Sequence, residues 1–345
     1  WLAAFVLGFA MAAAMAPYYL LPLLVTGLAG LVWLMDGAVS GAKPRRAAFG
    51  TAWWFAFGYF LLSLYWMAFS FMVHATSGLH LVALAAMGFT GVAGLAGFVA
   101  FFYGAAFWLV AGFWRHDWQR VLVLVLAWSA AEYLRGHLFT GLPWNLTAQA
   151  LAAFAAPSQL VALIGPYGLG LVVALIASLP AALVTRDGKP VAWWPPLAGS
   201  AGLIVAVLAF GAIRLAGAEL SYVENARVQI VQPAIIQQDK INPERFVDNF
   251  YTHLDLSGGA AATDGLGADG TLYVIWPENA AYQFLERDPE ARALLSERLP
   301  AGAILLTGAL RVDEPAPDDW RYYNSLLVVT DHVLPAENVD SDNET

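Results

Sequence analysis

The sequence predicts a polytopic α-helical membrane bundle with about seven spans, followed by a smaller α/β domain. Of the 345 residues, 59% are hydrophobic and only 12% are charged, and the mean hydropathy is +0.60. A soluble domain is about half apolar and a quarter charged, so this is the composition of a membrane protein. Residues 1–213 hold 8 Lys or Arg and 4 Asp or Glu, whereas residues 214–345 hold 9 and 22. We therefore expect a transmembrane helical domain over residues 1–213 and an acidic, water-exposed domain over residues 225–345.

The apolar segments of the first domain are long enough to cross a bilayer, which takes about 20 residues of helix. Seven such segments are predicted, at 1–16, 18–35, 49–73, 79–113, 121–138, 159–184 and 197–213. The fourth exceeds one span, and its repeated glycines suit close helix packing or a kink.

Orientation follows from the basic residues in the short connections, since these favour the cytoplasmic side. Connections 36–48, 114–120 and 185–192 carry seven of them, and Arg135 is the exception: Lys43, Arg45, Arg46, Arg115, Arg120, Arg186 and Lys189. An odd number of spans then places residues 215–345 on the opposite, external side of the membrane.

The acidic domain changes from helical spans to short runs rich in β-branched residues. Strands are predicted at 226–232, 271–276, 303–310 and 324–329. Two helices between them have clear starts, because Asn242-Pro243 and Asp288-Pro289 each supply a capping side chain and a proline at the first helical position. Strands alternating with helices indicate a layered α/β domain.

Composition excludes several kinds of site. The chain contains no cysteine, which rules out disulfides, thiolate metal sites and a thiol nucleophile within these residues. The histidines lack the spacing of metal ligands, and no basic cluster suits a nucleic acid. The letters GLGADG at 265–270 resemble a dinucleotide fingerprint but precede a strand, so we interpret them as a loop. No metal, cofactor or nucleic-acid partner is expected.

The segment after the fifth predicted span is a candidate lipid contact. Glu132 and Arg135 lie three residues apart and can pair on one helix face. Gly141, Pro143 and Trp144 then end the helix at the external interface. One interpretation is an interfacial aromatic anchor beside a salt bridge. The other is a lid-like loop that touches a lipid substrate as it leaves the bilayer.

Glu278 follows the predicted strand TLYVIW, directly after Pro277. A solvated acid after a strand is the simplest interpretation. The carboxyl ends of strands in α/β domains are, however, where ligand chemistry is usually found, and a proline restricts the backbone just before the acid.

Several motifs, in order, resemble the apolipoprotein N-acyltransferases of Gram-negative bacteria over roughly residues 1–330: FTGLPWNL, VQIVQP, VIWPENA, LLTGAL and YYNSLLVV. The resemblance implies a nitrilase-like αββα sandwich domain on the periplasmic side of an inner-membrane helical bundle. It also implies transfer of an acyl chain from a phospholipid donor to a diacylglyceryl-cysteine apolipoprotein acceptor, the last step of lipoprotein maturation.

The same resemblance implies roles for three residues. The family's catalytic set is Glu, Lys and Cys, and its Glu matches Glu278, which would take the proton of the thiol and then of the incoming amine. The Lys would stabilise the oxyanion and the Cys would carry the thioester. Trp144 matches a position at the lipid entrance, and Asn324 matches a motif that supports the site. Both are expected to serve substrate binding.

The chain departs from the family in ways that affect activity. Its only lysines, Lys43, Lys189 and Lys240, precede Glu278, and it has no cysteine. Ile241 stands where the family often has tryptophan. We expect a fragment truncated at both ends, inactive as it stands, with an incomplete C-terminal domain.

Two other interpretations stay open. One is a non-catalytic membrane protein whose degenerate domain binds lipid or lipoprotein. A transporter is disfavoured, because charged residues are almost absent from the spans. Reading the gene past residue 345 separates the truncated acyltransferase from the non-catalytic protein. A lysine and a cysteine in frame indicate the enzyme, and a native stop indicates the non-catalytic protein.

Overall fold

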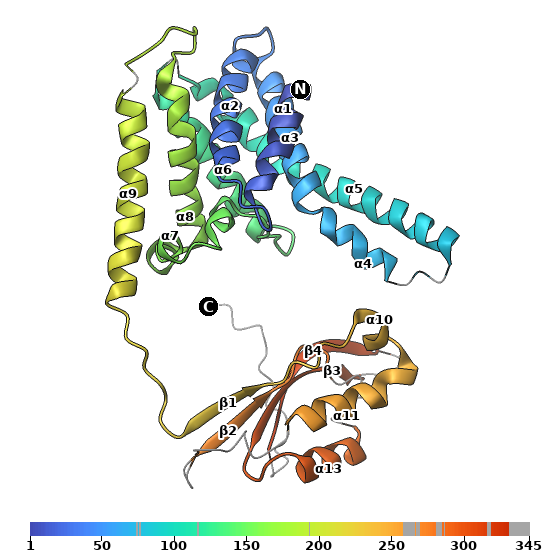
Figure 1. The fold of residues 1–345 in the computed structure, drawn as a ribbon. Helices are drawn as coiled ribbons and strands as arrows, with labels where there is room; N and C mark the ends of the chain where they lie inside the picture. Colours follow the sequence, from blue (N-terminus) through green and yellow to red (C-terminus); the bar gives the residue numbers. More distant parts are fainter. Residues whose placement is uncertain are drawn as a thin grey trace. The chain divides into compact units, whose positions relative to one another are not determined.

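The computed structural model describes residues 1–73, 75, 77–115, 117–192, 194–257, 266, 270–280, 285, 287–315 and 319–330 (Figure 1). Most of the GLGADG loop, and histidines 74, 116 and 332, lie outside these residues. The chain divides into two compact units, Trp1–Glu219 and Leu220–Thr345.

The first unit is entirely helical apart from its connections. Its long helices are α1 (Leu2–Met11), α2 (Pro22–Val39), α3 (Pro44–Ser63), α5 (Gly78–Val110), α6 (Gln119–His137), α8 (Val161–Ser178) and α9 (Trp194–Ala216). Two short helices, α4 (Phe69–Met72) and α7 (Ala155–Ser158), lie between them. Pro22 and Pro44 stand at the first turn of α2 and α3, where the missing N–H of proline costs no hydrogen bond.

By length and apolar composition, four helical segments can cross a membrane: Pro22–Val39, Gly78–Phe113, Val161–Leu183 and Trp194–Ala216. A fifth arises if Pro44–Ser63 and Tyr65–Met72, which meet at a bend of 55°, are counted as one span. The segment Leu2–Ala14 is apolar but shorter, and α6 carries three Arg or Glu side chains. Among the described residues there are thus four to five candidate spans, and seven remains a prediction.

Glycines allow the helices of this bundle to approach closely. A Cβ added to Gly8 in α1 would lie 1.9 Å from the carbonyl oxygen of Phe55 in α3. One added to Gly58 in α3 would lie 2.3 Å from the oxygen of Phe5. The backbones of α1 and α3 therefore touch at positions that only glycine can occupy, which is common for helices packed in lipid.

The second unit contains a four-stranded mixed sheet in the order β1-β2-β3-β4. The strands are β1 (Ala226–Ile230), β2 (Thr271–Ile275), β3 (Ile304–Asp313) and β4 (Arg321–Val329). β1, β2 and β3 are parallel, and β4 is antiparallel to β3 over nine residue pairs. This hairpin carries both strands beyond their predicted ends, because cross-strand pairing extends them through Arg311 and Tyr323.

Helices α11 (Phe246–Ser257) and α13 (Pro289–Arg298) cover one face of this sheet (Figure 1). Phe250 and Leu254 of α11 pack with Leu272, Val274 and Leu305 of the strands. The alternating residues of the strands face the other way, and Val228, Ile230, Leu326 and Val328 are exposed: 57%, 75%, 65% and 49%. One layer of helices on one sheet is described here, and the αββα sandwich remains a prediction.

Candidate active site and lipid-contact loop

Glu278 lies just beyond the carboxyl end of β2. Pairing with β3 continues past the strand, since the N–H of Trp276 donates to Leu306 O at 2.9 Å and that of Ala280 donates to Gly308 O at 3.2 Å. A Cβ on Gly308 would lie only 2.7 Å from the Cα of Glu278. A glycine is therefore required at 308, in the LLTGAL motif, to let the Glu278 backbone lie against β3.

Asn324 of β4 meets the side chain of Glu278. Its Nδ2 donates a hydrogen bond to Glu278 Oε1 at 2.6 Å, and both residues are exposed. The amide fixes the direction of the carboxylate while leaving it accessible to a reactant. Two of the three residues singled out from the sequence, 46 positions apart, are thus in contact.

Lys240 contacts Glu278, and the sequence did not predict this contact. It ends the short helix α10 (Gln237–Lys240), and its Nζ donates to the backbone oxygen of Glu278 at 2.9 Å. The ammonium group therefore holds the main chain of Glu278 rather than its carboxylate. No local pattern signals this contact, because the two residues are 38 positions apart.

Trp144 belongs to the first unit, in the loop after α6. Its ring lies against that of Trp66 with the centroids 5.3 Å apart and the planes 31° apart. Trp144 is 43% exposed and Trp66 is 50% exposed. The two indoles form an exposed aromatic pair between this loop and the bend that follows α3.

Arg135 holds the loop that carries Trp144. The buried guanidinium donates from Nη1 to Leu142 O and to Trp144 O, the latter at 2.8 Å, and from Nη2 to Asn145 O at 3.2 Å. Its Nε donates to the hydroxyl of Tyr103 at 3.1 Å. Because a buried guanidinium must use its donors, the loop backbone is shaped around this side chain.

The predicted Glu132–Arg135 pair is present only as a long contact. Arg135 Nη2 and Glu132 Oε1 are 4.0 Å apart, whereas Glu132 Oε1 accepts from the N–H of Thr147 at 2.7 Å and from its hydroxyl at 2.9 Å. Each member of the pair therefore binds the 138–147 loop more closely than it binds its partner. The two together fasten residues 142–147 of that loop to α6.

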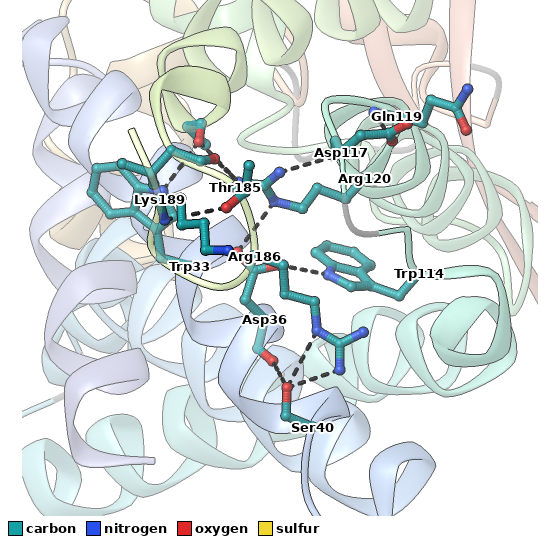
Figure 2. A network of polar contacts seen from close by, with 12 residues as sticks. Trp33, Asp36, Ser40, Trp114, Asp117, Gln119, Arg120, Thr185, Arg186 and Lys189 are labelled. Atoms are coloured by element: carbon teal, nitrogen blue, oxygen red, sulfur yellow. Dashed lines mark hydrogen bonds and ion pairs between the residues drawn. The ribbon is translucent and has the colours of Figure 1, made fainter. Parts of the chain in front are cut away.

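A second buried polar network lies at the other end of α6 (Figure 2). Arg120 Nε and Asp36 Oδ2 are 3.1 Å apart, and Trp114 Nε1 donates to Asp36 Oδ1 at 2.8 Å. Arg120 Nη2 also donates to Ala181 O and Val184 O. Arg120, predicted in a connection, is instead fully buried at the start of α6. The network ties α2 and α6 to the segment that follows α8.

Among the described residues, no group of three His, Asp or Glu side chains lies close enough to hold a metal ion. What the second unit offers chemically is one accessible carboxylate with an amide partner. The first unit offers an exposed indole pair, of which Trp144 lies on an anchored loop and Trp66 lies in the bend after α3.

Comparison with known proteins identifies the family. A family model described as the apolipoprotein N-acyltransferase N-terminal domain matches residues 7–179, half of the chain. Apolipoprotein N-acyltransferases of Rhodopseudomonas palustris and Bradyrhizobium diazoefficiens are 35% and 36% identical over 324 and 327 residues. That of Caulobacter vibrioides is 34% identical over 330 residues.

These alignments cover 92–94% of this chain and 59% of each relative, so the chain spans about three fifths of the relatives' length. The resemblance drawn from the sequence motifs is confirmed. The chain belongs to the apolipoprotein N-acyltransferase family.

Proposed function

We propose that the chain forms part of an enzyme that transfers an acyl chain from a phospholipid to the amino terminus of a diacylglyceryl-cysteine apolipoprotein. The observation that carries this proposal is the 2.6 Å hydrogen bond from Asn324 to Glu278, in a chain similar to apolipoprotein N-acyltransferases. The carboxylate follows one of three parallel strands, at the end where α/β sheets bind ligands. Four to five candidate spans are consistent with a substrate drawn from a bilayer.

In the proposed mechanism, Glu278 is the general base of two successive transfers. It takes the proton of a cysteine thiol, and the thiolate attacks the phospholipid ester to form a thioester as the lysophospholipid leaves with a proton. It next takes a proton from the acceptor amine, which attacks the thioester and releases the thiol. A lysine stabilises the oxyanion of each tetrahedral intermediate.

We place the thiol and that lysine in the complete gene product, outside residues 1–345. Residues 1–345 contain no cysteine, and no lysine follows Glu278. We therefore expect residues 1–345 alone to form no thioester. Trp144, paired with Trp66, is proposed to contact the lipid or lipoprotein substrate.

A complementation experiment tests this function. The complete gene product containing residues 1–345 is expressed in a bacterium depleted of its own apolipoprotein N-acyltransferase, and the masses of lipoprotein amino-terminal peptides are measured. We expect the mass of a third acyl chain on these peptides. A non-catalytic lipid-binding protein would leave their amino termini free even when it is abundant in the membrane.

We further propose seven spans in the inner membrane, with the second unit in the periplasm. Residues 1–345 contain no cysteine, so single cysteines introduced into residues 1–345 at the exposed positions Ala42 and Ser296 report topology without background. An impermeant thiol reagent is expected to label S296C in intact cells, and A42C only after lysis. The reverse pattern would contradict both the orientation and the periplasmic chemistry.

A further inference from the structure

The backbone on either side of Glu278 is bound to β3 by the N–H groups of Trp276 and Ala280. β2 ends at Ile275, Pro277 has no N–H to donate, and Asn279 adopts a left-handed conformation with φ of 49°. The Glu278 carbonyl is bound by the Lys240 ammonium at 2.9 Å. A charged donor makes a stronger hydrogen bond than a neutral one, so Lys240 is a main support of this turn.

Lys240 is itself positioned by helix α11. Asn249 of α11 donates from Nδ2 to Asp239 O at 3.0 Å, which fastens the end of α10. The imidazole of His253 donates from Nδ1 to Asn249 O at 2.7 Å, one turn along. Burial lowers the pKa of His253, the hydrogen bond to Asn249 opposes that change, and the Lys240 ammonium reinforces it. The imidazole is therefore neutral at pH 7, with its proton on Nδ1.

The same helix also holds the residue on the other side of Pro277. Trp276 Nε1 donates to Ser257 Oγ at 2.6 Å, and Ser257 Oγ donates to His253 O at 2.6 Å. Together with the Lys240 contact these bonds close a ring from α10 through α11 to the turn after β2. The ring borders a cavity of about 270 Å³, and it meets the turn at two points, the Trp276 side chain and the main-chain oxygen of Glu278.

The charge distribution sets Lys240 apart. It is the only lysine in residues 214–345, where 22 acids outnumber 9 basic residues. It is distinct from the oxyanion lysine of the proposed mechanism, which is placed outside residues 1–345. Its contact is with the main chain of Glu278 and leaves the carboxylate to Asn324.

We propose that Lys240 is a positioning residue for the acyl transfer: its ammonium fixes the main chain of Glu278 and so aims the carboxylate held by Asn324. This rests on the proposed function. The variants are Lys240→Met, which keeps the length of the side chain but removes the donor, and Lys240→Arg, which keeps a charged donor. Lys189→Met, at an exposed loop position of the first unit, is the matched control.

The first measurement is steady-state acyl transfer by the complete gene product in phospholipid nanodiscs. Loss of one charged hydrogen bond at a half-exposed site predicts a fall in kcat of about tenfold for Lys240→Met. The KM of Lys240→Met for phospholipid should stay within about twofold of the wild-type value, because Lys240 is not proposed to touch that substrate. Lys240→Arg should recover most of kcat. A kcat for Lys240→Met equal to that of Lys189→Met would overturn the inference.

The second measurement does not depend on activity. Hydrogen exchange of the peptide that contains residues 276–280 is expected to be faster in Lys240→Met, while exchange in β3 and α13 stays unchanged. Unchanged exchange at 276–280 would refute the positioning contact. If the wild type transfers no acyl chain at all, the proposed function fails, and the exchange result still decides whether Lys240 holds the turn.

Discussion

Replacing Asp36 by alanine is expected to destabilise the helical unit by about 3–5 kcal/mol, the cost of leaving one member of a buried ion pair without its partner. Arg120 is fully buried, and its Nε lies 3.1 Å from Asp36 Oδ2. The substitution would also leave Trp114 Nε1 without the carboxylate it now donates to at 2.8 Å. A guanidinium group keeps its charge in proteins.

The measurement is the unfolding free energy in mixed micelles at increasing denaturant. Asp187→Ala, at an exposed loop position, is the control and should change stability by less than about 0.5 kcal/mol. The double variant Asp36→Leu with Arg120→Met should recover much of the loss, because it removes both charges and restores apolar volume. Equal stability of Asp36→Ala and Asp187→Ala would mean that the network in Figure 2 does not hold the bundle together.

Glu278→Gln is expected to lower the rate of acyl transfer by the complete gene product by about 10²–10⁴-fold, the usual contribution of a general base. Glutamine has nearly the same shape and can still meet Asn324, but it cannot accept the proton of a thiol or an amine. Membrane insertion and stability should not change, because Glu278 is exposed. Asn324→Ala should lower the rate of acyl transfer less, by about tenfold to a hundredfold, since it removes one charged hydrogen bond and leaves the base.

The assay follows label from phospholipid to an apolipoprotein peptide. Glu290→Gln, in the first turn of α13 and exposed, is the matched control and should transfer at the wild-type rate. If Glu278→Gln retains more than about a tenth of the rate while Glu290→Gln retains all of it, Glu278 is a binding group and another residue is the base.

The parts of this fold that depend on local pattern could be predicted from the sequence. Apolar length located the helices of the first unit, and β-branched runs with Asn242-Pro243 and Asp288-Pro289 located the elements of the second. The limits of β3 and β4 could not be read locally, because their length is fixed by pairing with each other. The number of spans was also not settled, since α6 combines an apolar face with buried ionisable residues.

The candidate site could be predicted only in part, because its contacts join residues that lie far apart in the sequence. Spacing alone predicted that Glu132 and Arg135 would pair, yet both bind the backbone of a loop that only the folded chain brings near. The roles of Glu278 and Asn324 came from the resemblance rather than from spacing, and their contact joins β2 to β4. Lys240 offered no signal, because a side chain that binds a distant carbonyl leaves no periodicity in the sequence.

In the proposed mechanism, Glu278 activates a thiol that accepts the acyl chain. The most direct test is the intact mass of the complete gene product after incubation with phospholipid and without any apolipoprotein acceptor. We expect a mass increase of one acyl chain, reversed by hydroxylamine, in the wild type and in Glu290→Gln. We expect none in Glu278→Gln or in residues 1–345 alone. An acyl adduct that forms on Glu278→Gln at the wild-type rate would show that Glu278 is not the base, and an adduct on the cysteine-free 345 residues would show that the acyl chain is not carried by a thiol.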